Sequence, residues 1–75
     1  MKELVEYIVK GLVDQPDQVV VTEIRRGNSI TLELRVAPDD MGRVIGKGGR
    51  VANAIRSLLR VVAVKDNTRV TLEIM

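Results

Sequence analysis

The chain opens with apolar residues at spacings of three and four, which is the period of an amphipathic helix. The residues that carry this period are Met1, Leu4, Val5, Ile8, Val9 and Leu12. Pro16 cannot continue a helix, so we expect this first helix to end between Gly11 and Asp14.

Two segments with a strand-like pattern follow the helix. Residues 19–26 are mostly β-branched or charged, and residues 29–36 alternate strictly between apolar and polar, as in a strand with one buried face. The alternating apolar positions are Ile30, Leu32, Leu34 and Val36. Gly27 and Asn28 lie between the two segments, so we predict an antiparallel hairpin with a tight turn.

The hydrophobic pattern also distinguishes two registers for this hairpin, because a slip of one residue turns every side chain to the other face. A two-residue loop at 27–28 would place charged residues of the first strand opposite Ile30 and Leu32. A three-residue loop at 26–28 would place Ile24 opposite Ile30 instead. We predict the three-residue loop, which gives the pairs Ile24–Ile30, Thr22–Leu32 and Val20–Leu34.

A short second helix is predicted after the hairpin. Pro38, Asp39 and Asp40 are typical of a helix start, where an Asp oxygen accepts a backbone N–H and its charge is favoured by the helix dipole. We expect Gly46 to end this helix. Its apolar side is formed by Met41, Val44 and Ile45.

A third helix begins at Arg50 and carries an apolar arc of roughly 200°, wider than the ~100° that a core-facing helix needs. The arc comprises Val51, Ala52, Ala54, Ile55, Leu58, Leu59, Val61, Val62 and Ala63. One face of a small sheet cannot cover all of this surface. Residues 68–75 alternate again, with apolar residues at 70, 72 and 74, and we predict a third strand there.

The predicted order is helix, strand, strand, helix, helix, strand, in a single domain of residues 1–75. The hairpin is antiparallel, whereas the connection through two helices suits a right-handed crossover between parallel strands, with its helices on one sheet face. We therefore predict an α+β fold of order αββααβ, with a three-stranded mixed sheet and three helices on one face.

The composition argues against several classes of function. The chain of 75 residues has no cysteine and no histidine, and Tyr7 is its only aromatic residue. These absences exclude a disulfide framework and a thiolate metal site, and they remove most ordinary catalytic residues. Asp39, Asp40 and Ser57 are the only conceivable catalytic groups, and nothing in the sequence indicates that they are activated. We expect neither an enzyme nor a cofactor, metal or small-molecule substrate.

No segment is apolar for long enough to span a membrane, since the longest run is Val61–Val64 and a bilayer needs roughly 20 residues. The start of the chain carries Glu3 and Glu6 within its apolar pattern, which the hydrophobic region of a signal peptide would not tolerate. We therefore expect a cytoplasmic protein without a membrane anchor.

Charge is unevenly distributed, although the net charge is only +2. Residues 1–40 hold five Lys or Arg against eight Asp or Glu, a balance of −3, whereas residues 41–75 hold seven against two, a balance of +5. No acid interrupts the cations Arg43, Lys47, Arg50, Arg56, Arg60 and Lys65. Such a stretch attracts polyanions and indicates a nucleic-acid contact, although a solvated basic helix face would show the same pattern.

The most distinctive segment is the turn between the second and third helices, where residues 44–51 are VIGKGGRV. Glycines allow positive φ and the close approach of another chain, and unpaired amides at a helix start can hold a phosphate. A P-loop would need a hydroxyl residue where Gly48 stands, and a dinucleotide motif would need a glycine at Val51 and a preceding strand. A plain helix–helix turn remains the structural alternative.

A third phosphate-binding motif, G-x-x-G between two helices of a βααβ unit, is the loop with which KH domains clamp a single-stranded backbone. Residues 46–49 supply this motif, Val44 and Ile45 supply the apolar pair before it, and Ile55 and Leu58 continue the next helix. The whole chain resembles a type II KH domain. Its size is similar to that of the small bacterial single-KH proteins of the KhpA (YlqC-like) type.

The resemblance implies which residues contact RNA. Backbone contacts would come from Gly46, Lys47, Gly48, Gly49 and Arg50, and the base groove would be lined by Val44, Ile45, Val51 and Ala52. Arg43, Lys65 and Arg69 are further candidates, the last two because the final strand and the loop before it border the groove in KH domains. No aromatic residue lies near the turn to stack on bases, so we expect weak binding with loose sequence preference.

The surplus apolar surface at the end of the third helix indicates association. We expect self-association through Leu58, Val61, Val62 and Val64, although a fraying helix end packed on the core would also explain these residues. The resemblance also implies pairing with a larger KH-containing partner of the Jag type. The expected function is single-stranded RNA binding in post-transcriptional regulation or as an RNA chaperone. The alternative is an adaptor whose main ligand is another KH-containing protein.

Overall fold

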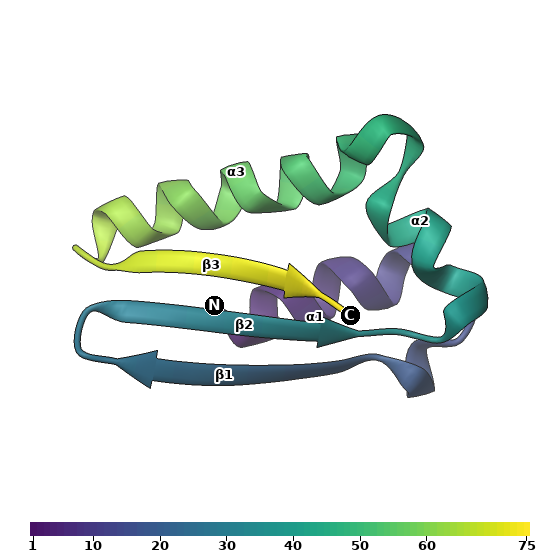
Figure 1. The fold of residues 1–75 in the computed structure, drawn as a ribbon, viewed down its shortest axis with the longest axis horizontal. Helices are drawn as coiled ribbons and strands as arrows, with labels where there is room; N and C mark the ends of the chain where they lie inside the picture. The colour runs from purple at the N-terminus through teal and green to yellow at the C-terminus, as the bar shows by residue number, and fades with distance from the viewer.

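The computed structural model describes residues 1–75 and contains the predicted helices and strands in the predicted order (Figure 1). The helices are α1 (Lys2–Leu12), α2 (Met41–Ile45) and α3 (Arg50–Lys65), and the strands are β1 (Val20–Arg26), β2 (Ser29–Arg35) and β3 (Arg69–Ile74). Short 3-10 turns lie at Pro16–Gln18, Pro38–Asp40 and Lys47–Gly49. None of the helices has both the length and the apolar character that crossing a membrane requires.

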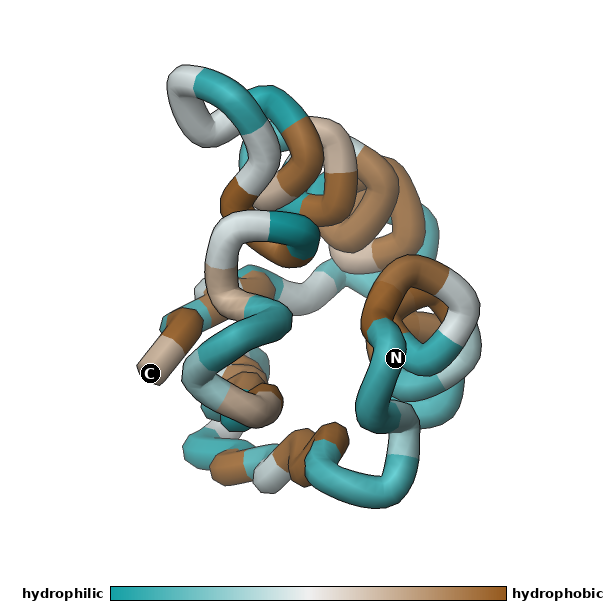
Figure 2. Tube along the Cα trace, turned by 90° about the vertical axis from the view of Figure 1, so that its right-hand side faces the viewer, coloured by the Kyte–Doolittle hydropathy of each residue, from teal (hydrophilic) through white to brown (hydrophobic).

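The strands form one mixed sheet in the order β1–β2–β3. β1 and β2 are antiparallel, whereas β2 and β3, which α2 and α3 connect, are parallel. Figure 2, which looks nearly along the strands, shows α1 and α3 on the same side of the sheet, with their hydrophobic residues turned inwards. The predicted α+β class, mixed sheet and one-sided helical layer are confirmed.

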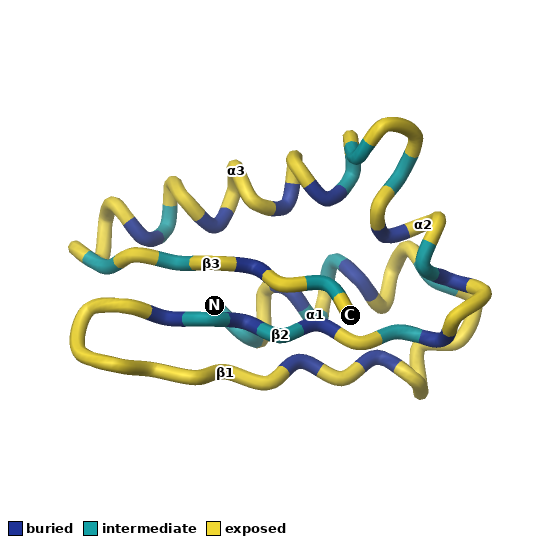
Figure 3. Tube along the Cα trace, viewed as in Figure 1, coloured by how far each residue is buried: buried dark blue, intermediate teal, exposed yellow.

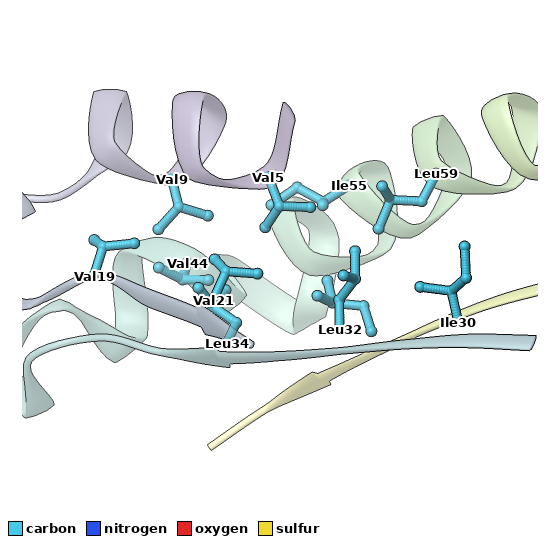
Figure 4. Packing of buried hydrophobic residues seen from close by; sticks show 11 residues of the cluster. Val5, Val9, Val19, Val21, Ile30, Leu32, Leu34, Val44, Ile55 and Leu59 are labelled. Carbon is cyan, nitrogen blue, oxygen red and sulfur yellow. The ribbon is translucent and has the colours of Figure 1, made fainter. Parts of the chain in front are cut away.

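The core lies between the helices and the central strand. Val5 and Val9 of α1 and Ile55 and Leu59 of α3 form one cluster with Leu32 of β2, and each of these side chains is almost fully buried (Figure 4). Burial of each such side chain contributes about 1.5–3 kcal/mol. The rest of the cluster is Val19, Val21, Ile30, Leu34, Val44 and Leu72.

The hairpin register differs from the prediction. Arg26 pairs with Ser29 across a loop of two residues, so the predicted three-residue loop is wrong. Gly27 has a φ of +57°, as the first central residue of a type II′ turn requires. The observed pairs include Val21–Leu34, Glu23–Leu32, Ile24–Thr31 and Arg25–Ile30.

The reason for this register is that α1 covers only one end of β1. Val21 is buried beneath α1, but every later residue of β1 is exposed (Figure 3). Glu23 and Arg25 therefore lie opposite core residues of β2 while their own side chains reach water. Charged residues on an edge strand also disfavour pairing with another chain.

The acids at the start of α2 do not act as the predicted cap. No side chain caps α2, and the carboxylate of Asp40, a residue only 1% exposed, turns to the segment after α1. The backbone N–H groups of Asp14 and Gln15 donate to this carboxylate at 3.1 Å each. The Arg43 guanidinium lies 2.9 Å from the Asp14 carboxylate and 3.7 Å from that of Asp40. This cluster holds α2 against the connection between α1 and β1.

Candidate nucleic-acid interface

The glycine turn joins α2 to α3 at one end of the molecule, at the upper right of Figure 1. Gly46, Gly48 and Gly49 have φ values of +74°, +66° and +80°. Residues with a side chain rarely adopt this left-handed region, so the path of the turn depends on its glycines. At Gly46, a Cβ would lie only 2.9 Å from the backbone nitrogen of Val51, whereas Gly48 faces open space.

Two backbone amides of the turn are free. The N–H of Gly49 donates to the carbonyl of Gly46 at 3.2 Å, and the N–H of Arg50 donates to the carbonyl of Lys47. Lys47 and Gly48 are the first two residues of the 3-10 turn, so their N–H groups precede its first hydrogen bond and have no partner within it, and no side chain caps the turn. Free amides at a helix start are donors for an anion such as phosphate.

Two cations flank these amides. Lys47 and Arg50 are exposed, and neither takes part in an ion pair. Their charges are therefore available to a ligand. Arg43 differs, because its guanidinium is already paired with Asp14 and Asp40.

The four apolar residues expected to line a base groove fall into two pairs. Val44 is completely buried and Ala52 is 3% exposed, so both belong to the core and offer no surface to a base. Ile45 is 38% exposed and Val51 is half-buried, and they lie on either side of the glycine turn. Only this second pair has apolar surface beside the turn.

A hollow of about 150 Å³ lies along the seam between α3 and β3. It is lined by Arg56, Leu59, Arg60, Val70, Thr71 and Leu72. The Arg56 guanidinium spans the seam, because its Nη2 donates to the carbonyl of Leu72 at 3.3 Å. In the sequence, Arg56 and Arg60 are cations of a basic stretch, and neither is among the residues predicted to form the site. Arg56 and Arg60 lie one turn apart on the same face of α3, and this spacing is the sequence signal that could have identified them as site residues.

β3 also presents a free backbone edge to this hollow. Its alternate residues bond to β2, as shown by the N–H of Arg69 donating to Asn28 at 2.7 Å and the N–H of Met75 donating to Leu34 at 2.9 Å. The peptide groups of residues 70, 72 and 74 consequently point away from the sheet. A base in the hollow would meet these donors and acceptors.

Lys65 and Arg69 lie away from the glycine turn. Arg69 opens β3, and Lys65 ends α3, so both are at the opposite end of the helix from the turn. Lys65 lines a hollow on the outer face of α3 with Val61 and Val64. The structure thus brings Lys47 and Arg50 together at the turn and separates Lys65 from them.

The outer face of α3 carries an exposed apolar patch, formed by Leu58, Val61 and Val64. These residues are 52%, 57% and 73% exposed, whereas Val62 is half-buried. The residues of α3 that enter the core are Ala52, Ile55, Leu59 and Ala63. The patch is therefore surplus to the core, as the width of the apolar arc indicates.

The sequence model of the KhpA/KhpB KH domain matches residues 2–74. An RNA-binding protein KhpA of Clostridium acetobutylicum is 57% identical over 75 residues, with both chains fully covered. Those of Caldanaerobacter subterraneus and Chlamydia trachomatis are 56% and 53% identical over this whole chain, which covers 100% and 96% of their lengths. No solved structure gives a significant match. The chain belongs to the KhpA/KhpB family of KH domains.

Proposed function

We propose that this protein binds single-stranded RNA and holds its sugar-phosphate backbone at residues 46–50. The observation that carries the proposal is the pair of free amides at Lys47 and Gly48, flanked by two unpaired cations. Membership of the KhpA/KhpB family and the name of the relatives, RNA-binding protein, support the same ligand.

Each part of the site has a distinct role in this proposal. The N–H groups of Lys47 and Gly48 donate hydrogen bonds to a phosphate, and the side chains of Lys47 and Arg50 neutralise it and its neighbour. Ile45 and Val51 contact the adjacent bases, and the Arg56 guanidinium and the free edge of β3 offer them hydrogen bonds. The only aromatic residue, Tyr7, lies on α1, so no stacking platform selects particular bases. Affinity should fall with salt by a slope of roughly −0.7 per phosphate.

The test replaces Lys47 and Gly48 together by Asp. The chain offers a matched control, because Lys10 and Gly11 are the same dipeptide at the exposed end of α1. We expect the loop variant to remain folded by circular dichroism and to lose crosslinking to RNA in cells, while the control retains it. Undiminished crosslinking of the folded loop variant would show that the backbone is held elsewhere.

The biological role that we propose is post-transcriptional regulation or RNA chaperoning in the cytoplasm, without enzymatic chemistry. Weak contact over a few nucleotides and loose base preference suit a protein that acts on many RNAs. RNA crosslinked to the intact protein in cells should then come from many transcripts, and a single dominant RNA would argue against this breadth.

A second candidate function is supported by the apolar patch of Leu58, Val61 and Val64. Exposed apolar surface of this kind marks interfaces. We propose that the patch pairs with a second copy of the chain or with a larger KH-containing protein of the Jag type, in which case the protein is also an adaptor. Val61→Asp should lower the mass in solution measured by light scattering, and Val20→Asp on the open face of the sheet should not. This role would be excluded if the wild-type chain has the mass of a monomer alone and does not bind such a partner.

A further inference from the structure

Asp40 is the only buried residue of the chain with a charged or polar side chain. Its two carboxylate oxygens accept one hydrogen bond each from the backbone N–H groups of Asp14 and Gln15, at 3.1 Å. These donors belong to the segment that follows α1, whereas Asp40 directly precedes α2. A carboxylate that accepts two backbone N–H groups makes strong, charge-assisted contacts. This side chain therefore ties the start of α2 to a distant part of the chain.

α2 depends on such contacts for its direction. The helix has five residues, which corresponds to about 7.5 Å along its axis, and so short a helix is not stable by itself. Asp40 holds its start, and the completely buried side chain of Val44 holds its middle. Its end is held by Gly46, which packs against Val51. The glycine turn follows at once and takes its position from α2 (Figure 1).

A small change at the start of α2 is therefore sufficient to disturb the turn. A tilt of about 10° about the Asp40 end would move the other end of the helix by roughly 1.5 Å. Groups that bind a ligand have to be held to within ~0.5 Å of their productive positions. After such a tilt, the N–H groups of Lys47 and Gly48 would no longer be placed for one phosphate.

Arg43 reinforces the same contact from the outer side of α2. Its Nε lies 3.7 Å from Oδ1 of Asp40, and its Nη2 lies 2.9 Å from Oδ2 of Asp14. The guanidinium thus bridges the carboxylate that precedes α2 and the segment that follows α1. Two acids already balance its charge, so it offers little attraction to a phosphate.

We propose that Asp40 is a positioning residue for RNA binding, which acts with Arg43 to fix α2 and thereby the amides of the glycine turn. Neither side chain contacts the RNA in this arrangement. The proposal rests on the proposed function and deepens it, because it makes the segment after α1 part of the support of the site. Preorganisation of this kind raises affinity, since the free protein already has the geometry that binding requires.

The test depends on the sign of the change in affinity. Asp40→Asn removes an acid near the phosphate site, and the loss of an acid alone raises the affinity for a polyanion. A positioning role predicts the opposite, namely binding of an unstructured single-stranded RNA that is weaker by about fivefold or more. Affinities are measured with the full chain by fluorescence anisotropy at several salt concentrations. An affinity of the folded Asp40→Asn variant equal to or above that of the wild type would overturn the positioning role.

The matched control is Asp39→Asn, which makes the same change of charge at the neighbouring position. Asp39 is exposed and forms no ion pair or side-chain hydrogen bond. Its replacement should leave the affinity unchanged or raise it. A loss in the control as large as that in Asp40→Asn would overturn the special role of the buried carboxylate.

A second control separates the position of the turn from general stability. Ile30→Val removes one buried methylene at the hairpin end of β2, the opposite end of the molecule from the glycine turn (Figure 1). It should lower stability and leave RNA affinity unchanged. The NMR signals of the Lys47 and Gly48 amides in the free protein should move in Asp40→Asn and stay at their wild-type positions in Ile30→Val. Equal losses of affinity in the two variants would overturn the positioning role.

If Asp40→Asn does not fold, as judged by circular dichroism, Arg43→Gln decides the matter. Its control is Arg35→Gln, which removes another exposed cation. A positioning role predicts that Arg43→Gln binds RNA more weakly than the control does, with an unchanged salt slope. A slope shallower by about 0.7 would make Arg43 a phosphate contact instead, and a loss no larger than that of the control would remove the cluster from the site. Either result would overturn the positioning role.

The Lys47/Gly48 variant separates this role from the proposed function. Undiminished RNA binding by that variant would refute the backbone site at the turn. If that variant loses binding while Asp40→Asn binds as tightly as the wild type, only the positioning role is refuted.

Discussion

Gly46 and Val51 approach so closely that a Cβ on the glycine would lie 2.5 Å from Cγ2 of the valine. The end of α2 and the first turn of α3 are thus packed directly against each other. This contact sets the direction in which the amides of the turn point. The glycines of the GKGG segment therefore have different functions, with Gly46 serving the packing and Gly48 the exposed surface.

Substitution by alanine should separate these two functions. Gly46→Ala combines a disfavoured backbone (φ +74°, ψ 174°) with a steric clash, so we expect the free energy of unfolding to fall by about 3 kcal/mol. Gly48→Ala meets no neighbouring atom and should cost only about 1 kcal/mol for its left-handed backbone. Urea unfolding of both variants measures the difference, and equal losses would contradict the packing role of Gly46.

The buried carboxylate of Asp40 should matter more than its exposed neighbours. Asp40→Asn removes one of the two oxygens that accept backbone N–H groups and weakens the contact with Arg43, so we expect a loss of about 2 kcal/mol in unfolding free energy. Asp14→Asn, which weakens only an exposed ion pair, should cost less than about 1 kcal/mol. A larger effect for Asp14 in chemical denaturation would disprove this ranking.

Arg56 is expected to contribute to RNA binding rather than to folding. Its bond to the Leu72 carbonyl is long, at 3.3 Å, and only partly buried, so Arg56→Gln should change the unfolding free energy by less than about 1 kcal/mol. We expect affinity for single-stranded RNA to fall about fivefold with an unchanged salt slope, because Arg56 offers its hydrogen bonds to bases and not to phosphates. Filter binding across a salt series tests both values, and a slope shallower by about 0.7 would mean that Arg56 contacts a phosphate instead.

An aromatic residue beside the turn should strengthen binding. Ile45 is 38% exposed, and Ile45→Tyr would add a ring on which a base can stack, with a gain of ~1–3 kcal/mol per base. We expect affinity to rise about tenfold, whereas Val20→Tyr on the open face of the sheet should leave it unchanged. The same gain in both variants would mean that stacking occurs anywhere on the surface, and no gain in either would remove Ile45 from the groove.

The alternation of apolar residues in β2 was sufficient to predict the strand and its buried face, because Ile30, Leu32 and Leu34 sit on the central strand under the helices. The glycine turn was equally predictable, since positive φ and helix ends have sequence signatures. These features depend on local chemistry. Each requires only the residues within one element or turn.

The features that could not be predicted depend on how far one element reaches over another. The hairpin register follows from where α1 stops covering β1, which leaves Glu23 in water. Asp40 has the position of a helix cap, but its partners lie 25 and 26 residues earlier in the chain. Val44 appears beside the glycine motif in sequence, yet the turn of α2 directs it inwards. Sequence spacing alone does not reveal these contacts between distant elements.

The two edge strands of the sheet, β1 and β3, disfavour aggregation in different ways. Along β1, an additional strand paired at the edge would bury the charges of Glu23 and Arg25. Along β3, the Arg56 guanidinium donates a long hydrogen bond to the Leu72 carbonyl, and a ligand that binds there would have to replace it. The backbone edge of β3 is therefore open to reversible binding of a ligand, while the sheet as a whole does not favour the addition of strands from other chains.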